Sequence, residues 1–173
     1  MAPSLSGGVA FSRTVLKILV VLNILGALPL LAMFLGTFFF QDVVVTVFRG
    51  RPDADDATTL LLGIRLWVIV AIPIVPLIHR ILARLIAIVE TVALGDPFVP
   101  DNAVRLKQIA WAQLGLEVLS LVFGVFANAL SRPGHVIEWS FSLTGWVAVL
   151  LLFVLARVFE EGTRMRADLE GTV

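Results

Sequence analysis

Four long apolar runs constrain this chain more than any other feature of its sequence. They cover about residues 18–40, 60–79, 109–130 and 141–159. A helix needs about 20 mostly apolar residues to cross the hydrocarbon core of a bilayer. In addition, 59% of all residues are hydrophobic and only 15% are charged, whereas about a quarter of the residues in soluble domains are charged. The runs therefore predict an all-α integral membrane protein, a bundle of four transmembrane helices.

The composition argues against several classes of function. The formal net charge is zero, which gives no sign of direct nucleic-acid binding. The chain has no cysteine and only two histidines, which argues against thiolate or histidine-rich metal sites. Glu160 and Glu161 are adjacent, so on a helix their side chains diverge by about 100° and do not form a catalytic pair. We therefore expect no enzymatic activity, no cofactor and no metal.

Basic residues near the ends of the runs predict the orientation of the bundle. With the N-terminus inside, the inner segments hold nine Lys and Arg residues and the outer loops hold three. The inner residues are Arg13, Lys17, Arg80, Arg84, Arg105, Lys107, Arg157, Arg164 and Arg166, and the outer ones are Arg49, Arg51 and Arg132. Cytoplasmic segments carry the excess of Lys and Arg, so we expect both termini in the cytoplasm.

The second helical pattern continues past the end of its span. Residues 60–94 would form a helix of roughly 52 Å at 1.5 Å per residue, whereas the hydrocarbon core is only about 30 Å thick. The third pattern, which starts near Asn102, is also too long. We predict that residues 80–108 project as a cytoplasmic helical hairpin and that residues 160–173 form a cytoplasmic tail. The whole chain, 1–173, is expected to be a single membrane domain.

The stretch LGDPFVPDNAVRLKQ contains the turn of this hairpin. Gly95 suits the position just after a helix, because glycine adopts a positive φ freely. Pro97 and Pro100 prevent the first helix from continuing. Asp101 or Asn102 can cap the helix that follows.

Two apolar residues, Phe98 and Val99, fall at the tip of this turn, where water is expected. They either fold back on the hairpin or meet a partner. The tail carries Glu160 and Arg164 at the favoured i,i+4 spacing for an ion pair, and it can lie beside the hairpin. The predicted partner-binding residues are Phe98, Val99, Asp101, Asn102, Arg105 and Arg164.

Two segments resemble the bacterial membrane family called domain of unknown function 2975. They are GDPFVPDNAVRLKQIAW at residues 95–111 and LLLFVLARVFEEGTRMRADLEGTV at residues 150–173, with Gly-Asp-Pro-Phe, Asn-x-x-Arg-Leu and Phe-x-x-Gly signatures. The resemblance implies four transmembrane helices in the inner membrane and no established activity. Members are often encoded beside a small helix-turn-helix regulator, which implies a small cytoplasmic regulatory protein as the partner. Our first hypothesis is therefore a non-enzymatic sensor or tether for such a regulator.

Polar residues form a stripe along the third span. Gln113, Glu117, Ser120, Gly124 and Asn128 are three or four residues apart, so they fall within about an 80° arc of a helix. Arg65 in the second span is the candidate partner of Glu117, although it can instead reach outward or bond outer-loop carbonyls. Asn23 in the first span can reach the same interior. Polar residues in a span turn inward and are often functional.

The sequence IPIVP in the second span supports an alternative function. Pro73 and Pro76 remove hydrogen bonds to two backbone carbonyls, which must then find other donors or line a cavity. A kinked helix beside the polar stripe could bind a small ligand, a lipid or a proton, as in an oligomeric transporter. The stripe can instead hold the helices together, and we prefer this interpretation. Gly26, Gly36 and Gly124 fit close helix contacts within one chain or in a homo-oligomer.

Two outer segments have the composition of strands. DVVVTVF at residues 42–48 and HVIEWSF at residues 135–141 are rich in β-branched and aromatic residues. They can pair as a short extracytoplasmic β-ribbon, or they can extend or shield the ends of the helices. Between them, Asp53, Asp55 and Asp56 lie close together in a segment that we interpret as a solvated turn.

Overall fold

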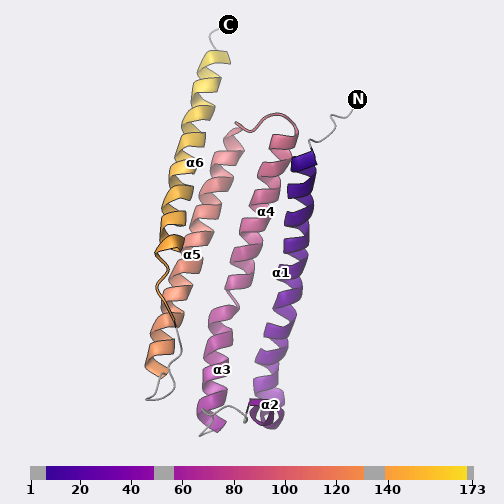
Figure 1. Cartoon of the computed structure of the whole chain (residues 1–173), viewed down its shortest axis with the longest axis vertical. Coiled ribbons are helices and arrows are strands. Elements are labelled where there is room, and N and C mark those ends of the chain that lie inside the picture. The colour runs from indigo at the N-terminus through magenta and orange to yellow at the C-terminus, as the bar shows by residue number, and fades with distance from the viewer. Residues whose placement is uncertain (1–6, 49–56, 131–138, 171–173) are drawn as a thin grey trace. The chain divides into compact units, whose positions relative to one another are not determined.

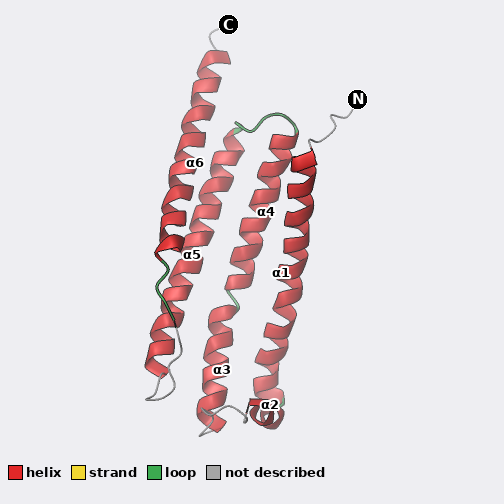
Figure 2. Cartoon of the chain, viewed as in Figure 1, coloured by secondary structure: helices red, strands yellow, loops and turns green. Residues whose placement is uncertain are grey.

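The computed structural model of the chain describes residues 7–48, 57–130 and 139–170 (Figure 1). In chain order the helices are α1 (Gly7–Phe39), α2 (Gln41–Phe48), α3 (Ala57–Ala71), α4 (Ile74–Ala93), α5 (Pro100–Leu130) and α6 (Leu143–Glu170). Within these ranges every regular element is a helix (Figure 2). The predicted all-α class is therefore confirmed for the part of the chain that the structure describes.

Four helical stretches are long and apolar enough to cross a membrane. They are Gly7–Phe39, Leu61–Ala93, Pro100–Asn128 and Leu143–Leu169. At most 22% of the residues in the most apolar part of any of them are buried inside the protein. Since so large an exposed apolar surface is unusual for a soluble monomer, these helices fit a multi-pass membrane protein. Each of the four predicted spans falls largely within one of these stretches.

The chain divides into two compact units. Unit 1 consists of Met1–Leu22, Leu77–Glu117 and Ser142–Val173, and unit 2 consists of Asn23–Pro76 and Val118–Phe141. Unit 1 thus takes the first part of α1, nearly all of α4, the first part of α5 and all of α6. Unit 2 takes the rest of α1, with α2, α3 and the end of α5.

The prediction of a strand at residues 42–48 is wrong, because this segment is helix α2. Helical hydrogen bonds continue past α1, from Phe40 N to the Gly36 carbonyl (2.9 Å) and from Val44 N to the Phe40 carbonyl (3.0 Å). The helix packs against α3 and buries Val45. Strand propensity is weak compared with such packing. Of the second predicted strand, residues 135–138 lie outside the described residues, and 139–141 are neither strand nor helix.

The second span is interrupted at its prolines, where the sequence predicts a kinked helix. Helix α3 ends at Ala71 and α4 begins at Ile74. Pro73 has no N–H to donate, and Val75 N donates to the Ile72 carbonyl at 3.3 Å. Asn23 from α1 also donates its side-chain amide to the Val75 carbonyl at 3.1 Å. The Val75 carbonyl beside the break thus accepts a hydrogen bond from a side chain of α1, within unit 2.

The turn between α4 and α5 ends one helix and starts the next. Gly95 has a φ of 85°, which confirms its predicted role after α4. Gly95 N donates to the Val92 carbonyl (3.0 Å) and Asp96 N to the Thr91 carbonyl (3.1 Å), which is the bonding pattern of a Schellman motif. Pro100 is the first residue of α5, where its missing N–H costs nothing. Asp101 and Asn102 therefore both lie inside the first turn, so neither occupies the predicted capping position.

Candidate functional site

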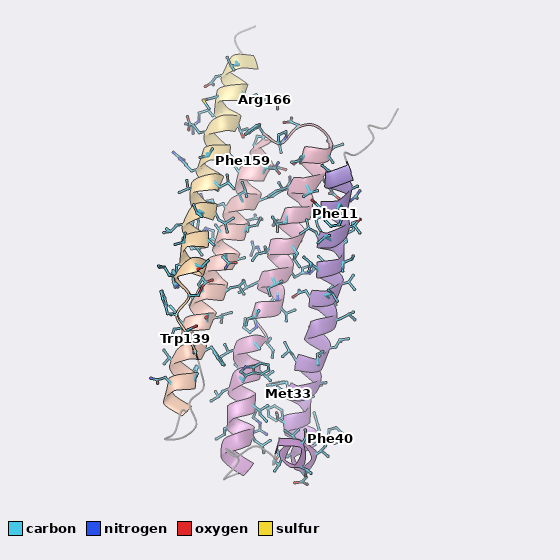
Figure 3. All side chains as sticks on the ribbon, viewed as in Figure 1. Phe11, Met33, Phe40, Trp139, Phe159 and Arg166 are labelled. Carbon is cyan, nitrogen blue, oxygen red and sulfur yellow. The ribbon has the colours of Figure 1, made fainter. Side chains whose placement is uncertain are left out.

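The α4–α5 turn packs against α6 within unit 1. The ring of Phe98 lies 5.3 Å from that of Phe159, centroid to centroid, and Gly162 is beside it. Arg166 also donates to the Asp96 carboxylate at 2.5 Å. Figure 3 labels Phe159 and Arg166 along the second half of α6. The turn and the tail form one surface, which we call the platform and define as residues 94–101 and 159–169.

Phe98 lies at the tip of the turn, and its ring folds back on α6, although 44% of the residue stays exposed. The Gly-Asp-Pro-Phe signature and the Phe-x-x-Gly signature therefore meet in space, through Phe98 on one side and Phe159 and Gly162 on the other. These signatures belong to segments far apart in the chain, so their contact defines how the turn and the tail are arranged in unit 1.

Asn102 organises the turn from inside the protein. Its side chain is fully buried, and its amide nitrogen donates to the Thr91 hydroxyl (2.6 Å) and the Pro97 carbonyl (2.9 Å). Its side-chain oxygen accepts from Arg105 at 2.8 Å. All the hydrogen-bonding groups of the side chain thus have partners. Asn102 was predicted to bind a partner, but its side chain is not accessible to one. It instead holds the turn in place through its hydrogen bonds.

Arg105 belongs to the same network. It also donates to the Ala87 carbonyl and to Asp101, both at 3.4 Å. Its side chain is 22% exposed, whereas that of Asp101 is 77% exposed. Arg105 therefore joins α4 to α5, and Asp101 faces outward. Among the other predicted partner-binding residues, Arg164 is exposed and Val99 is half-buried.

A groove runs between the start of α5 and the second half of α6. It has a volume of about 520 Å³. The lining residues are Pro100, Ala103, Val104, Lys107, Phe153, Ala156, Arg157, Glu160, Thr163, Arg164 and Ala167. Their side chains combine an apolar floor with three basic groups and one acidic group. The groove is not evident from the sequence, because its existence depends on the register of α6 against α5.

Ion pairs on α6 differ from the predicted one. Arg157 pairs with Glu160 at 3.1 Å, and Arg164 pairs with Glu161 at 3.4 Å. Both pairs are i,i+3, so the expected pair between Glu160 and Arg164 is replaced. Exposed helix pairs at either spacing contribute only about 0.2–0.5 kcal/mol, too little for the sequence to decide between them.

The polar stripe of α5 meets the beginning of α6 within unit 1. Gln113 donates to the Glu117 carboxylate at 3.0 Å. The same carboxylate lies against Gly145 in the first turn of α6, in the space that a Cβ would need. Gly145 N donates to the Ser142 hydroxyl at 3.4 Å, as expected for a helix N-cap. The positive end of a helix dipole stabilises a nearby carboxylate, so this position suits Glu117.

Further along α5, in unit 2, the stripe contacts the segment at Trp139. The indole N–H donates to the Ser120 hydroxyl at 3.3 Å. The ring lies so close to Gly124 that any side chain there would overlap it. Trp139, labelled in Figure 3, thus packs on the small residues of the stripe. Asn128, near the end of α5, is exposed.

Arg65 has its partners on α1, in unit 2. It donates to the Thr37 carbonyl at 2.5 Å and to the Thr37 hydroxyl at 3.4 Å, and its guanidinium lies 4.4 Å from the Phe38 ring centroid. Thr37 is fully buried in the last turn of α1, where carbonyls lack helical partners. Arg65 therefore bonds a carbonyl in the last turn of α1, in place of both the proposed pairing with Glu117 and the alternative of an outer-loop carbonyl.

Among the described residues, no three His, Asp or Glu side chains gather as a metal site. The cluster of Asp53, Asp55 and Asp56 lies outside those residues.

Comparison with known proteins supports the resemblance seen in the sequence. The sequence model of a family described as "Protein of unknown function (DUF2975)" matches residues 50–173. The match contains the α4–α5 turn, α5 and α6, and it confirms the resemblance carried by the Gly-Asp-Pro-Phe and Phe-x-x-Gly signatures. No curated protein and no solved structure matches the chain significantly.

Proposed function

The chain belongs to the DUF2975 family, whose function is unknown, and from this premise we propose that it is a non-enzymatic tether in the bacterial inner membrane. It holds a small cytoplasmic regulatory protein, of the helix-turn-helix type implied by the family resemblance, on the platform. Both termini and the platform lie in the cytoplasm.

Exposed apolar side chains on the platform carry this proposal. Leu94, Leu169, Met165 and Phe98 are 80%, 72%, 56% and 44% exposed. They lie beyond Lys107 and Arg157, the basic residues that end the apolar runs of α5 and α6. Lipid tails do not cover apolar groups at that level. Exposed apolar patches on a water-facing surface mark protein interaction sites, and Asp101 and Arg164 supply a charged rim around this one.

The distribution of basic residues supports the orientation. Of the ten Lys and Arg residues that the structure describes, nine belong to unit 1 and only Arg65 belongs to unit 2. Arg49, Arg51 and Arg132 lie outside the described residues. The positive-inside rule assigns segments rich in Lys and Arg to the cytoplasm, which is also the compartment of the proposed partner.

The alternative function, a small-ligand binder or oligomeric transporter that uses the polar stripe, is supported less well. Glu117, Ser120 and Arg65 already bond to protein groups within their own units. The Arg65 contact joins α3 to α1 and the Ser120 contact joins α5 to the segment at Trp139, as do polar groups that hold a helix bundle together. The hydrogen bond of Glu117 is made within α5. A Glu117→Gln variant that changed ligand-dependent stability or flux would favour this alternative.

Site-specific crosslinking in native membranes tests the tether. A photo-reactive amino acid replaces Met165 on the platform, and the matched control replaces Leu151, an exposed residue in the apolar part of the same helix. We expect one small cytoplasmic protein to crosslink at position 165 and only lipid to crosslink at position 151. The same protein should be lost from a Leu94→Ser, Met165→Ser variant that still reaches the membrane. Lipid adducts at both positions would contradict the tether.

A further inference from the structure

We propose that the groove between α5 and α6 binds one anionic phospholipid, with the headgroup phosphate between Lys107 and Arg157 and an acyl chain against Phe153. This inference goes beyond the tether and does not depend on it, because it concerns the membrane-proximal end of the groove. The tether uses the apolar residues of the platform, and of its charged rim only Arg164 also lines the groove.

The size and lining of the groove fit such a ligand. About 520 Å³ is within the usual range of about 300–1,000 Å³ for small-molecule sites. The floor is apolar, with Ala103, Val104, Phe153 and Ala156 among the lining residues. Phe153 is also held edge-to-face against Trp111, at 5.4 Å between ring centroids. A headgroup and the first part of an acyl chain would bury this apolar surface.

The charges on the rim favour an anion. Lys107, Arg157 and Arg164 line the groove together with one acidic residue, Glu160. Arg157 and Glu160 pair at 3.1 Å, but a guanidinium has five N–H donors and can bind a phosphate as well. Lys107 makes no ion pair with any other residue that the structure describes. Arg164 pairs with Glu161, which does not line the groove, at 3.4 Å. Even when both pairs are counted, Lys107 leaves the groove with an excess of positive charge, which a phosphate would neutralise.

The position of the groove along the helices favours a lipid over a soluble anion. Helix α6 has no charged residue from Leu143 to Ala156, and α5 has none between Lys107 and Glu117. Lys107 and Arg157 thus stand where the apolar runs end, at the expected level of the headgroups. Next to them, Leu150, Leu151 and Val154 are exposed and offer a surface for an acyl chain. Basic pockets between transmembrane helices at this level bind anionic headgroups.

A zwitterionic lipid is a poorer match for the same groove. Its headgroup carries a cationic amine beside the phosphate, and that amine would add a positive charge to a groove that already has an excess of it. Phosphatidylglycerol carries the phosphate without the amine. We therefore expect the groove to bind the anionic lipid more tightly than the zwitterionic one. Such selectivity distinguishes a specific binding site from the non-specific contact of lipid with apolar helices.

Lipid titration of the purified full chain tests the proposal. The protein, delipidated in a neutral detergent, is titrated with short-chain phosphatidylglycerol or phosphatidylcholine, and bound lipid is counted by native mass spectrometry. We expect one phosphatidylglycerol to bind, and Lys107→Gln to weaken its binding about fivefold, the effect of one basic residue near an anionic headgroup. Lys17→Gln, an exposed lysine of α1 outside the groove, is the matched control and should bind like the wild type.

A second variant tests whether the lipid occupies the groove itself. Val104→Trp fills the groove without changing its charge, and Val104 is exposed enough for the variant to fold. It should lose the bound lipid while keeping the lipid-free unfolding temperature. A Val104→Trp variant that still bound one phosphatidylglycerol would overturn the proposal.

Three further outcomes of the titration would also overturn it. They are equal binding of the two lipids, equal effects of Lys107→Gln and Lys17→Gln, and displacement of the lipid by an equal concentration of inorganic phosphate. In the last case the groove would bind free phosphate and not a lipid. Because the titration contains no partner protein, its result is independent of the tether.

Discussion

The carboxylate of Glu117 occupies the space in which a β-carbon of residue 145 would lie. Glycine at position 145 therefore lets α5 bring an acidic side chain against the first turn of α6. The Glu117 carboxylate is stabilised there by the positive end of the α6 dipole, and it accepts a hydrogen bond from Gln113 at 3.0 Å. This contact gives the most polar residue of the stripe a structural role inside an otherwise apolar part of unit 1.

Replacing Gly145 by Ala should destabilise the protein. The added methyl overlaps the Glu117 carboxylate, and overpacking of this kind costs about 1–3 kcal/mol. Thermal unfolding of the purified chain in a mild detergent measures the loss. Gly26→Ala is the matched control, because nothing lies within 4 Å of its Cβ position and alanine favours a helix.

Removal of the Glu117 side chain should suppress this effect. In a Glu117→Ala background the space is free, so Gly145→Ala should cost much less than it does in the wild type. A double-mutant cycle measures the coupling between the two positions. Equal costs in both backgrounds would show that the two residues are not in contact.

Replacing Asn102 by Asp should loosen the platform. The substitution keeps the shape of the side chain but removes the amide donors to the Thr91 hydroxyl and the Pro97 carbonyl. The contact with Arg105 is kept, but the Thr91 and Pro97 oxygens lose their donor, and a buried polar group without a partner costs about 1–3 kcal/mol. Thermal unfolding and protease cleavage at the α4–α5 turn report the change.

Asp96→Asn in the same turn is the comparison variant. Its ion pair with Arg166 is about half exposed, and such pairs contribute about 0–1 kcal/mol. We therefore expect Asp96→Asn to be much milder than Asn102→Asp. The reverse order would mean that the surface ion pair, and not the buried amide, holds the turn.

Replacing Arg65 by Leu should destabilise unit 2. The Thr37 carbonyl would lose its charged donor, and hydrogen bonds to charged groups contribute about 1.5–3 kcal/mol. Arg65→Lys should retain part of this stability, because an ammonium can still donate to one acceptor but cannot form both Thr37 contacts in the same geometry. The unfolding temperatures of the two variants test the order. If Arg65→Leu unfolded at the wild-type temperature, the contact with Thr37 would contribute nothing.

The features that the sequence predicts correctly are those set by local chemistry. The four apolar stretches follow from hydropathy along the chain, and the disturbance of the second span at Pro73 follows from a missing N–H. The positive φ of Gly95 follows from the absence of a β-carbon. Each of these depends on a residue and its immediate neighbours. The Gly-Asp-Pro-Phe and Phe-x-x-Gly signatures were likewise enough to indicate the family.

The tertiary structure decided what these residues touch. Asn102 looked like a surface cap and is fully buried, while Arg65 bonds a carbonyl of α1 instead of Glu117. The β-branched segment at residues 42–48 is a helix because packing on α3 outweighs strand propensity. The groove at Lys107 and Arg157 requires the register of α6 against α5. Hydropathy and turn chemistry are properties of neighbouring residues, whereas register and burial are set by contacts between residues far apart in the chain.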